Sequence, residues 1–292
     1  MMKLNEIKVK ELLRVGLKED VGTGDITSAI TIDKNLKIHA NLLIREPGVI
    51  AGLDILRLFL KFTNKSIKFK AYAKDGDFIK AGKGKKAKII AKVYGNARDI
   101  LKVERIALNI ISHLSGVATL TYKFVQGTKG YKTKIVDTRK TTAGLRYFEK
   151  YAVKVAGGYN HRMGLYDQVL IKDNHIKASG LTPAECVRLA RKKTKKNIEV
   201  EIKKVGQLLN AIKANPDIIM LDNMSLKQIK EAVLLKDKFY KSNGHHKRIA
   251  IEVSGNVKLS NIRKLAVCKV DMISIGALTH SNSSLNMALK II

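Results

Sequence analysis

The sequence predicts an α/β protein made of a small antiparallel α+β region followed by a parallel α/β barrel. Its length of 292 residues suits two domains, or one barrel with an added module. In the first part of the chain, short segments alternate between apolar and polar residues, as half-buried strands do. After Lys134, short apolar runs recur with helix-like stretches between them, which is typical of repeated β–α units with buried strands.

The N-terminal region is expected to contain two helices and three strands. The apolar spacing of amphipathic helices is present in Asn5–Glu19 and Gly52–Phe62. The alternation of strands is present in Lys37–Ile44, Ile67–Ala73 and Lys88–Tyr94. This combination predicts a small antiparallel α+β domain.

Two turn signals and one long helical segment complete this region. Asp75-Gly76 is a hairpin signal. Gly82–Lys86 is rich in glycine and lysine, but it lacks the terminal Lys-Ser/Thr and the strand–loop–helix context of a phosphate loop, so we expect a charged hairpin loop. Asn96–Gln126 is expected to be a helix interrupted at Ser115-Gly116, and its apolar residues lie nearly all round it, which predicts burial between layers or subunits.

The second region is expected to supply the barrel. Helices are expected at Leu145–Ala156, Pro183–Lys193, Val205–Ala214, Leu226–Leu235 and Ser260–Ala266. Right-handed crossovers between parallel strands follow from this alternation. Each apolar run ends in a polar residue or glycine, which favours a closed or nearly closed barrel over an open, doubly wound sheet. The predicted strands are Ile135–Val136, Val169–Ile171, Ile198–Ile202, Ile218–Leu221, Ile249–Val253 and Met272–Ile275.

Composition excludes some classes of protein. No apolar run is long enough for a transmembrane helix, and the N-terminus has no apolar signal core. The two cysteines, Cys186 and Cys268, lie far apart in apolar helical contexts, so we expect structural thiols and a reducing, cytoplasmic location. The net charge of +31 leaves two interpretations open: a solvated lysine-rich surface, which we favour, and binding to nucleic acid.

Charged residues follow the predicted strands, and in parallel α/β folds the carboxyl ends of the strands form the active site. The first two strands and the loop between them supply Arg139, Lys140, His161, Arg162 and Lys172. These groups predict a pocket for an anion, and for one with more than one negative group. The alternatives are a buried ion pair in the barrel core and, for His161, the role of a helix-capping or core histidine.

The later strands end in different chemistry. Glu201 and Asp222 form a pair of carboxylates that can hold a sugar diol or Mg²⁺. Ser254-Gly255-Asn256 and Gly276-Ala277 are turns whose amides can bind phosphate. The pocket would thus suit an anionic small molecule beside a phosphorylated sugar with a metal. Two nearby residues, Asp173 and His175, can equally lie behind the site or beside the metal.

The sequence also resembles the quinolinate phosphoribosyltransferase family over nearly its whole length. The central motif, DTRKTTAGLRYFEKYAVKVAGGYNHRMGLYDQVLIKDNH (137–175), is highly specific. The other matching stretches are EDVGTGDITS (19–28), REPGVIAGLD (45–54), ERIALNIISHLSGVATLT (104–121), EVE (199–201), IMLDN (219–223), EVSGNV (252–257) and ISIGALTHS (273–281).

The resemblance implies an N-terminal α/β sandwich domain, which we place at 1–112. It also implies a C-terminal α/β barrel of six or seven strands at 113–292, whose last helix packs back on the first domain. It further implies a homodimer, or a higher oligomer, in which the partner completes each active site. Arg105 resembles the arginine that reaches in from the neighbouring subunit.

The resemblance also assigns roles within the pocket. Thr138, Arg139, Lys140, His161, Arg162 and Lys172 resemble the residues that bind quinolinate. Glu201 and Asp222 resemble the carboxylates near the ribose and Mg²⁺, which is held largely through the sugar pyrophosphate and water. Ser254 to Asn256 and Ile275 to Ala277 resemble the phosphate-binding turns. We expect Lys140, Glu201 and Asp222 to be catalytic.

The implied activity is that of a pentosyltransferase of de novo NAD biosynthesis. It transfers phosphoribosyl from 5-phosphoribosyl 1-pyrophosphate to quinolinate with decarboxylation, giving nicotinate mononucleotide, pyrophosphate and CO₂. The nearest alternatives are a barrel phosphoribosyltransferase that uses nicotinate and the paralogue associated with molybdenum transport. Nicotinate has a single carboxylate, so a pocket for a dianion argues against it. No membrane or specific nucleic-acid partner is expected.

Overall fold

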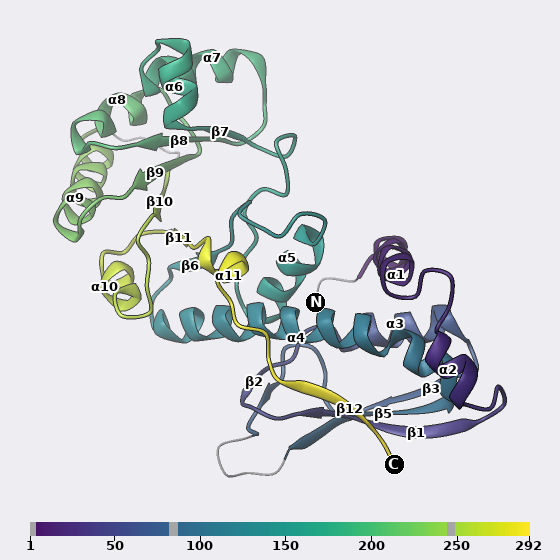
Figure 1. The fold of residues 1–292 in the computed structure, drawn as a ribbon. Coiled ribbons are helices and arrows are strands. Elements are labelled where there is room, and N and C mark those ends of the chain that lie inside the picture. Colours follow the sequence, from purple (N-terminus) through teal and green to yellow (C-terminus); the bar gives the residue numbers. More distant parts are fainter. Residues whose placement is uncertain (1–3, 82–86, 244–248) are drawn as a thin grey trace. The chain divides into compact units, whose positions relative to one another are not determined.

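The computed structural model describes residues 4–81, 87–243 and 249–292 (Figure 1). Contacts between Cα atoms divide the chain into two compact units. The first unit contains the chain up to Tyr122, Phe148–Gly157 and Ser281–Ile292. The second contains Lys123–Tyr147 and Gly158–His280. This division differs from the predicted boundary at 112/113, because one internal segment and the C-terminus return to the first unit.

The first unit is built on an antiparallel sheet with the strand order β12-β1-β5-β3. Its central strand, β1, pairs with β12 on one side and with β5 on the other. A separate pair joins β2 to β4. The strands are β1 (Lys37–Ile44), β2 (Gly48–Val49), β3 (Lys68–Ala71), β4 (Phe78–Ile79), β5 (Lys88–Asn96) and β12 (Met287–Ile291).

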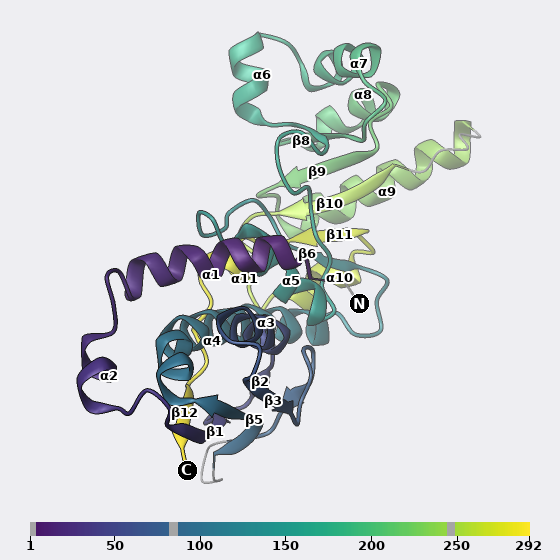
Figure 2. The ribbon, with the colours of Figure 1, turned by 90° about the vertical axis from the view of Figure 1, so that its right-hand side faces the viewer.

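Helices α3 and α4 cover one face of this sheet, as the two views of the ribbon agree (Figures 1 and 2). Apolar side chains fill the space beneath them, including Leu42 of β1 and Phe59 of α3, both buried. The helices of this unit are α1 (Glu6–Asp20), α2 (Ile26–Thr31), α3 (Leu53–Thr63), α4 (Ala97–Gly127, up to Tyr122) and most of α5 (Arg146–Val155). The predicted antiparallel α+β character is confirmed.

The expected interruption of α4 at Ser115-Gly116 is wrong, because the helix continues through both residues. These small residues mark close packing instead. The Ser115 hydroxyl accepts a hydrogen bond from the amide of Ala51 and donates one to its carbonyl. A Cβ atom on Gly116 would lie 2.3 Å from the carbonyl oxygen of Ser283, so a larger residue would not fit there.

The hairpin predicted at Asp75-Gly76 is also wrong. A turn exists there, but β3 pairs with β5 and β4 pairs with β2, so the flanking strands are not partners. Asp75 is buried, and its carboxylate accepts hydrogen bonds from the Leu53 amide and the Tyr151 hydroxyl. The turn therefore serves to cap α3 from a distance rather than to join two paired strands.

Two other differences concern short or terminal segments. Helix α2 was not predicted; the Asp25 side chain caps it by accepting from the amide of Ser28. The C-terminal segment is strand β12 rather than a helix, and it pairs with β1. The loop predicted at Gly82–Lys86 lies outside the described residues. No helix in the described part of the chain combines the length and apolarity that a membrane crossing needs.

The second unit contains six parallel strands in the order β6-β11-β10-β9-β8-β7. Strands that follow one another in sequence are neighbours from β7 to β11, and the last of them pairs with the first, β6. This is the cyclic order of an α/β barrel, opened between β6 and β7. The strands are β6 (Lys134–Val136), β7 (Val169–Ile171), β8 (Ile198–Ile202), β9 (Ile218–Asp222), β10 (Ala250–Ser254) and β11 (Met272–Ser274).

Between β6 and β7 the chain passes through α5, most of which belongs to the first unit. The other connections contain α6 (Asp173–Ser179), α7 (Pro183–Lys193), the 3₁₀ turn η1 (Val205–Gln207), α8 (Leu208–Lys213), α9 (Leu226–Asn243) and α10 (Ile262–Val267).

All six predicted barrel strands are confirmed, and their apolar residues form the core. Val200, Ile219 and Ile251 lie on three adjacent strands and have no exposed surface. Helices α7 to α10 lie along one side of the sheet (Figure 1). The carboxyl ends of all six strands point to one edge, which is where the sequence predicted the site.

Candidate active site

A cavity of about 640 Å³ opens at the carboxyl ends of the strands of the second unit. Of the predicted site residues, Arg105 is the exception: it is exposed on α4, in the first unit. Every other one lines the cavity: Thr138, Arg139, Lys140, His161, Arg162, Lys172, Glu201, Asp222, Ser254, Gly255, Asn256, Ile275, Gly276 and Ala277.

The segment after β6 carries the first cations, and local hydrogen bonds fix its backbone. The Lys140 amide donates to the Thr138 hydroxyl over 3.0 Å. The carbonyl of Lys140 accepts from the Thr279 hydroxyl over 2.6 Å, and the Arg139 carbonyl accepts from Arg146. Because the main chain is held on both sides, the two cationic side chains leave it at fixed points on the cavity wall.

Asp137, the last residue before this segment, organises the loop that follows α5. Its buried carboxylate accepts from the Asn160 side chain over 2.6 Å and from the His161 amide over 2.9 Å. Arg162 comes next and is 6% exposed, with its Nη1 donating to the Gln168 carbonyl over 3.1 Å. Burial lowers the pKa of the Arg162 guanidinium, yet arginine remains charged in proteins.

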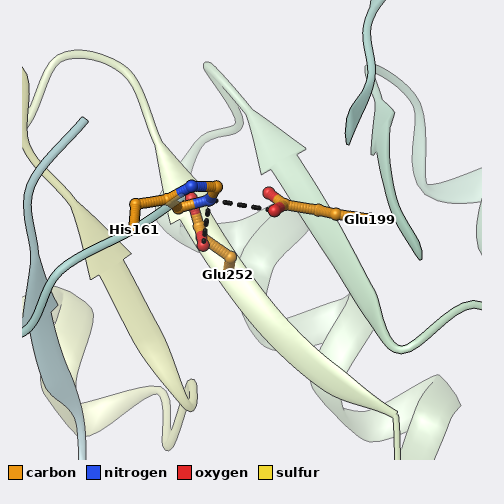
Figure 3. A group of neighbouring side chains, drawn as sticks. All are labelled: His161, Glu199 and Glu252. Carbon is orange, nitrogen blue, oxygen red and sulfur yellow. Dashed lines mark ion pairs between the residues drawn. The ribbon is translucent and has the colours of Figure 1, made fainter. Parts of the chain in front are cut away.

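His161 lies between two buried glutamates, Glu199 of β8 and Glu252 of β10 (Figure 3). Its Nε2 is 2.9 Å from Glu199 Oε2 and 3.6 Å from Glu252 Oε2. Its Nδ1 accepts a hydrogen bond from the Arg162 amide over 2.8 Å, and its Nε2 faces the two carboxyl groups.

Glu252 is the most perturbed acid of this cluster. Burial raises its pKa from 4.5 to about 8, and the charge of Glu199 adds to the shift, whereas His161, Ser274 and Lys172 oppose it. The folded protein thus keeps a proton here that the unfolded chain has lost between pH 4.5 and about 8. Across this range Glu252 makes the protein less stable as the pH rises.

We expect Glu252→Gln to raise the melting temperature at pH 8, with a gain that shrinks as the pH approaches about 5. Glutamine does not titrate, so the variant escapes the cost that grows with pH in the parent. Calorimetric scans across this range measure the difference. Glu231→Gln, at an exposed position of α9, is the control for the exchange of glutamate for glutamine. A gain from Glu252→Gln that stays flat with pH would contradict the assignment.

Glu201 and Asp222 lie at the ends of β8 and β9 and also line the cavity. Burial raises the pKa of Glu201, and the negative charge of Asp222 raises it further. Two carboxylates that repel each other in this way are suited to a cation, and Mg²⁺ prefers oxygen ligands. The residues present therefore fit the Mg²⁺ that the sequence predicted.

Hydrogen bonds join the turns that follow β9 and β10. The Asn223 amide donates to the Ser254 carbonyl over 2.9 Å, and the Asn256 side chain donates to Asn223 Oδ1 over 3.1 Å. Asn223, Gly255 and Asn256 all have a positive φ. A Cβ atom on Gly255 would lie 2.1 Å from Asn223 Oδ1, so glycine is required by both conformation and space.

Gly255→Ala is expected to lower the free energy of unfolding by roughly 1–3 kcal/mol. Alanine is strained in a backbone conformation of positive φ, and its Cβ displaces the Asn223 side chain. Denaturant unfolding measures this change. The control is Gly206→Ala, since a Cβ there has no atom within 4 Å and the backbone needs no positive φ. Equal stability of the two variants would show that the turn adapts to a side chain.

Residues Asp173 and His175 do not line the cavity. They begin helix α6, which the sequence did not predict, and the His175 Nδ1 caps it by accepting from the Lys172 amide over 2.9 Å. The Asp173 carboxylate accepts from Lys203 Nζ over 2.8 Å. Both residues thus hold the chain that follows Lys172 rather than contribute to the cavity.

Several cavity residues were missed in the sequence: Asn223, Glu252, Ser274 and His280 line it, and Glu199 lies behind it. A signal existed for two of them. Side chains two positions apart on a strand share a face, so Glu199 shares the face of Glu201, and Glu252 that of Ser254. Reading two positions back along the strand from Glu201 and from Ser254 would have identified Glu199 and Glu252.

Known proteins that are similar to this chain over nearly its whole length belong to one family. Residues 25–115 match the quinolinate phosphoribosyl transferase N-terminal domain, and residues 117–290 match the C-terminal domain of that family. The chain is 37% identical to the probable nicotinate-nucleotide pyrophosphorylase (carboxylating) of Bacillus subtilis, over 99% of this chain and 95% of that protein. It is 38% identical to the probable enzyme of the same name from Methanocaldococcus jannaschii, over 97% and 96% of the two chains.

A solved structure of similar fold and sequence supports the same family. The crystal structure of NadC from Streptococcus pyogenes superposes with a TM-score of 0.89 at 35% identity, covering 100% of both chains. The two matched domains together span most of the sequence, including every cavity residue discussed above. The chain belongs to the quinolinate phosphoribosyl transferase family.

Proposed function

We propose that this protein transfers phosphoribosyl from 5-phosphoribosyl 1-pyrophosphate to quinolinate and decarboxylates the product, giving nicotinate mononucleotide, pyrophosphate and CO₂ for NAD biosynthesis. One observation carries the proposal beyond family membership. Clustered cations, paired carboxylates and glycine-bearing turns line a single cavity at the carboxyl ends of one parallel sheet. That combination matches an aromatic dianion beside a phosphorylated sugar.

The cations account for recognition of quinolinate. Its two adjacent carboxylates lose water on binding, which is costly unless positive groups meet them. Arg139, Arg162 and Lys172 line the cavity and supply that charge. Arginine can meet a carboxylate with two parallel hydrogen bonds, which fixes the plane of the ring as well as its charge.

The paired carboxylates and the glycine-bearing turns are assigned to the sugar donor. Glu201 and Asp222 would hold the ribose hydroxyls and Mg²⁺, and the turns at Ser254–Asn256 and Ile275–Ala277 would bind phosphate through their amides. Lys140 lies beside Gly276, since a Cβ on that glycine would be 2.9 Å from Lys140 Cδ. When bound, Mg²⁺ neutralises charge on the pyrophosphate.

The chemistry needs no covalent nucleophile on the protein. The lone pair of the pyridine nitrogen forms the bond to the anomeric carbon, while the carbon–oxygen bond to pyrophosphate breaks and its electrons leave with pyrophosphate. Positive charge grows on the ribose, and Glu201 and Asp222 stabilise it; Lys140 stabilises the leaving group. The carboxylate next to nitrogen then leaves as CO₂, because the ring cation stabilises the electron pair left on carbon, which takes a proton.

A reconstitution assay tests the proposal. Purified protein with Mg²⁺ and the sugar donor should form nicotinate mononucleotide from quinolinate and not from nicotinate, as measured by chromatography. Product from nicotinate instead would move the chain to a different phosphoribosyltransferase. High-affinity binding of random duplex DNA with a steep salt dependence would favour a nucleic-acid role for the charge of +31.

We also propose a homodimer in which Arg105 of one subunit completes the site of the other. If so, Arg105→Ala and Lys172→Ala subunits should each be nearly inactive alone and regain activity when mixed. Random exchange makes half of the dimers mixed, each with one intact site, so about a quarter of the parent activity should return.

Subunit exchange must be verified independently in this experiment, for instance with two differently tagged chains. Verified mixed dimers without recovered activity would show that the two residues serve the same site within one chain.

The cellular location belongs to the same proposal. Both cysteines are free in the structure, with Cys268 buried and Cys186 half-buried. Free thiols suit a reducing compartment, and we therefore assign the protein to the cytoplasm.

A further inference from the structure

Arg162 belongs to a closed ring of contacts that links its side chain to its own backbone amide. Arg162 Nη1 donates to the Gln168 carbonyl over 3.1 Å, and Gln168 Nε2 donates to Glu199 Oε2 over 2.7 Å. The same oxygen lies 2.9 Å from His161 Nε2. The ring closes where His161 Nδ1 accepts from the Arg162 amide over 2.8 Å. The path thus leaves Arg162 by its side chain and returns to its backbone.

Glu199 is the member of this ring that is anchored in the sheet. His161, Arg162 and Gln168 all belong to the loop that precedes β7, whereas Glu199 lies within β8. Its backbone is in register with Leu170 on one neighbouring strand and Ile218 on the other, and it has no exposed surface. Two loop side chains therefore converge on one oxygen whose position the barrel fixes, as Figure 3 shows for His161.

Electrostatics act in the same direction. Burial and the neighbouring Arg139 lower the pKa of Arg162, and Glu199 opposes both, as does Asp167. A buried cation beside a second cation is costly without such a countercharge. Glu199 thus offsets part of the cost of keeping Arg162 charged at the wall of the cavity.

A metal site is the competing interpretation of this cluster. One atom each from His161, Glu199 and Glu252 lie within 4.8 Å of one another. A metal on His161 Nε2 would require the ring proton on Nδ1, where the Arg162 amide already donates a hydrogen bond, so the geometry disfavours a coordinated ion.

We propose that Glu199 is a positioning residue: it holds the loop of residues 161–168 so that the Arg162 guanidinium faces the carboxylate of the bound substrate. The inference rests on the proposed function, because it takes quinolinate as the ligand of Arg162. It assigns no contact between Glu199 and the substrate.

The test compares Glu199→Gln with the parent protein and with Glu231→Gln, an exposed control on α9. Glutamine keeps the shape, but its neutral amide oxygen is a weaker acceptor for the two contacts and supplies no countercharge to Arg162. The KM for quinolinate should rise about 10- to 100-fold, the range expected when a buried hydrogen bond to a charged group is lost. The KM for the sugar donor should change less than about threefold, because none of the residues assigned to that substrate makes a contact in the ring, although Glu201 follows Glu199 on β8.

A double-mutant cycle separates positioning from a general loss of structure. If Glu199 acts through Arg162, then Glu199→Gln should add less than about twofold to the effect of Arg162→Lys. Independent, multiplying effects would overturn the proposal. So would a stoichiometric metal in the protein without sugar donor that disappears in Glu199→Gln.

A second variant and the activity of the parent protein decide the remaining cases. If Glu199→Gln does not fold, Gln168→Met removes one contact of the ring and should raise the KM for quinolinate in the same direction; an unchanged KM would overturn the proposal. A parent protein that does not turn over quinolinate contradicts the proposed function itself. An active parent with an indistinguishable Glu199→Gln contradicts only the role of Glu199.

Discussion

Replacing Arg162 with alanine should lower kcat/KM for quinolinate by roughly 10²–10⁴-fold, the usual cost of removing one partner of a buried charge pair. Arg162 is 6% exposed, and its guanidinium is held by the Gln168 carbonyl, so it reaches its ligand in a nearly fixed orientation. Most of the loss should appear as weaker quinolinate binding. Steady-state kinetics and calorimetric titration with quinolinate measure both quantities.

The matched control is Arg188→Ala, which removes an exposed arginine from α7 of the same unit. It should leave the kinetics unchanged, which separates a local effect from the loss of one positive charge. Arg162→Lys should lie between the parent and the alanine variant, because lysine keeps the charge without the planar pair of donors. Near-parental affinity in Arg162→Ala would remove this residue from the pocket.

Replacing Glu201 with glutamine should lower kcat by about 10²–10³-fold, as loss of a group that stabilises transition-state charge usually does. The carboxylate is 7% exposed at the end of β8, and the nearby charge of Asp222 concentrates negative potential there. The affinity for quinolinate should change less than kcat, because Arg139 and Arg162 belong to the segments between β6 and β7 and not to β8. Single-turnover kinetics separate the chemical step from binding.

The pH dependence gives this prediction an independent check. Burial and Asp222 raise the pKa of Glu201 above its ordinary 4.5, so the carboxylate is protonated as the pH falls through that raised value. Activity should therefore fall on the acid side in the parent, and this acid limb should be lost in Glu201→Gln. An unchanged kcat, or an unchanged acid limb, would show that this carboxylate does not act in the chemical step.

The barrel was predictable because its strands are buried on both sides and therefore stand out as short apolar runs. Strands such as Ile198–Ile202 end where the pattern turns polar, which also placed Glu201 at the correct edge. The cavity residues followed from the same rule, since the carboxyl ends of parallel strands meet at one edge. The first unit was less regular, yet β1 and α3 still followed from their periodicity.

What was missed depends on contacts distant in sequence. The hairpin at Asp75 was wrong because its carboxylate is used by Leu53 and Tyr151, which local spacing does not reveal. Ser115 and Gly116 resembled a helix break because small residues that allow close packing look the same in sequence as residues that end a helix. Strand β12 forms by pairing with β1, at the other end of the chain.

The assignment of His161 shows the same limit within the site. Its residue type and position predicted a cavity residue, and it lines the cavity. Its contacts with the Arg162 amide and with two glutamates from separate strands form only after folding. The sequence predicts the position of this side chain at the cavity more readily than it predicts its partners.

The fate of the two quinolinate carboxylates tests the account most directly. Two preparations of quinolinate, isotopically labelled at one carboxylate or the other, would be incubated with the protein, Mg²⁺ and 5-phosphoribosyl 1-pyrophosphate. We predict labelled CO₂ only from the carboxylate next to nitrogen, equimolar with nicotinate mononucleotide and dependent on the sugar donor. Labelled CO₂ from the other carboxylate, release without the sugar donor, or no release from the folded protein would contradict the account.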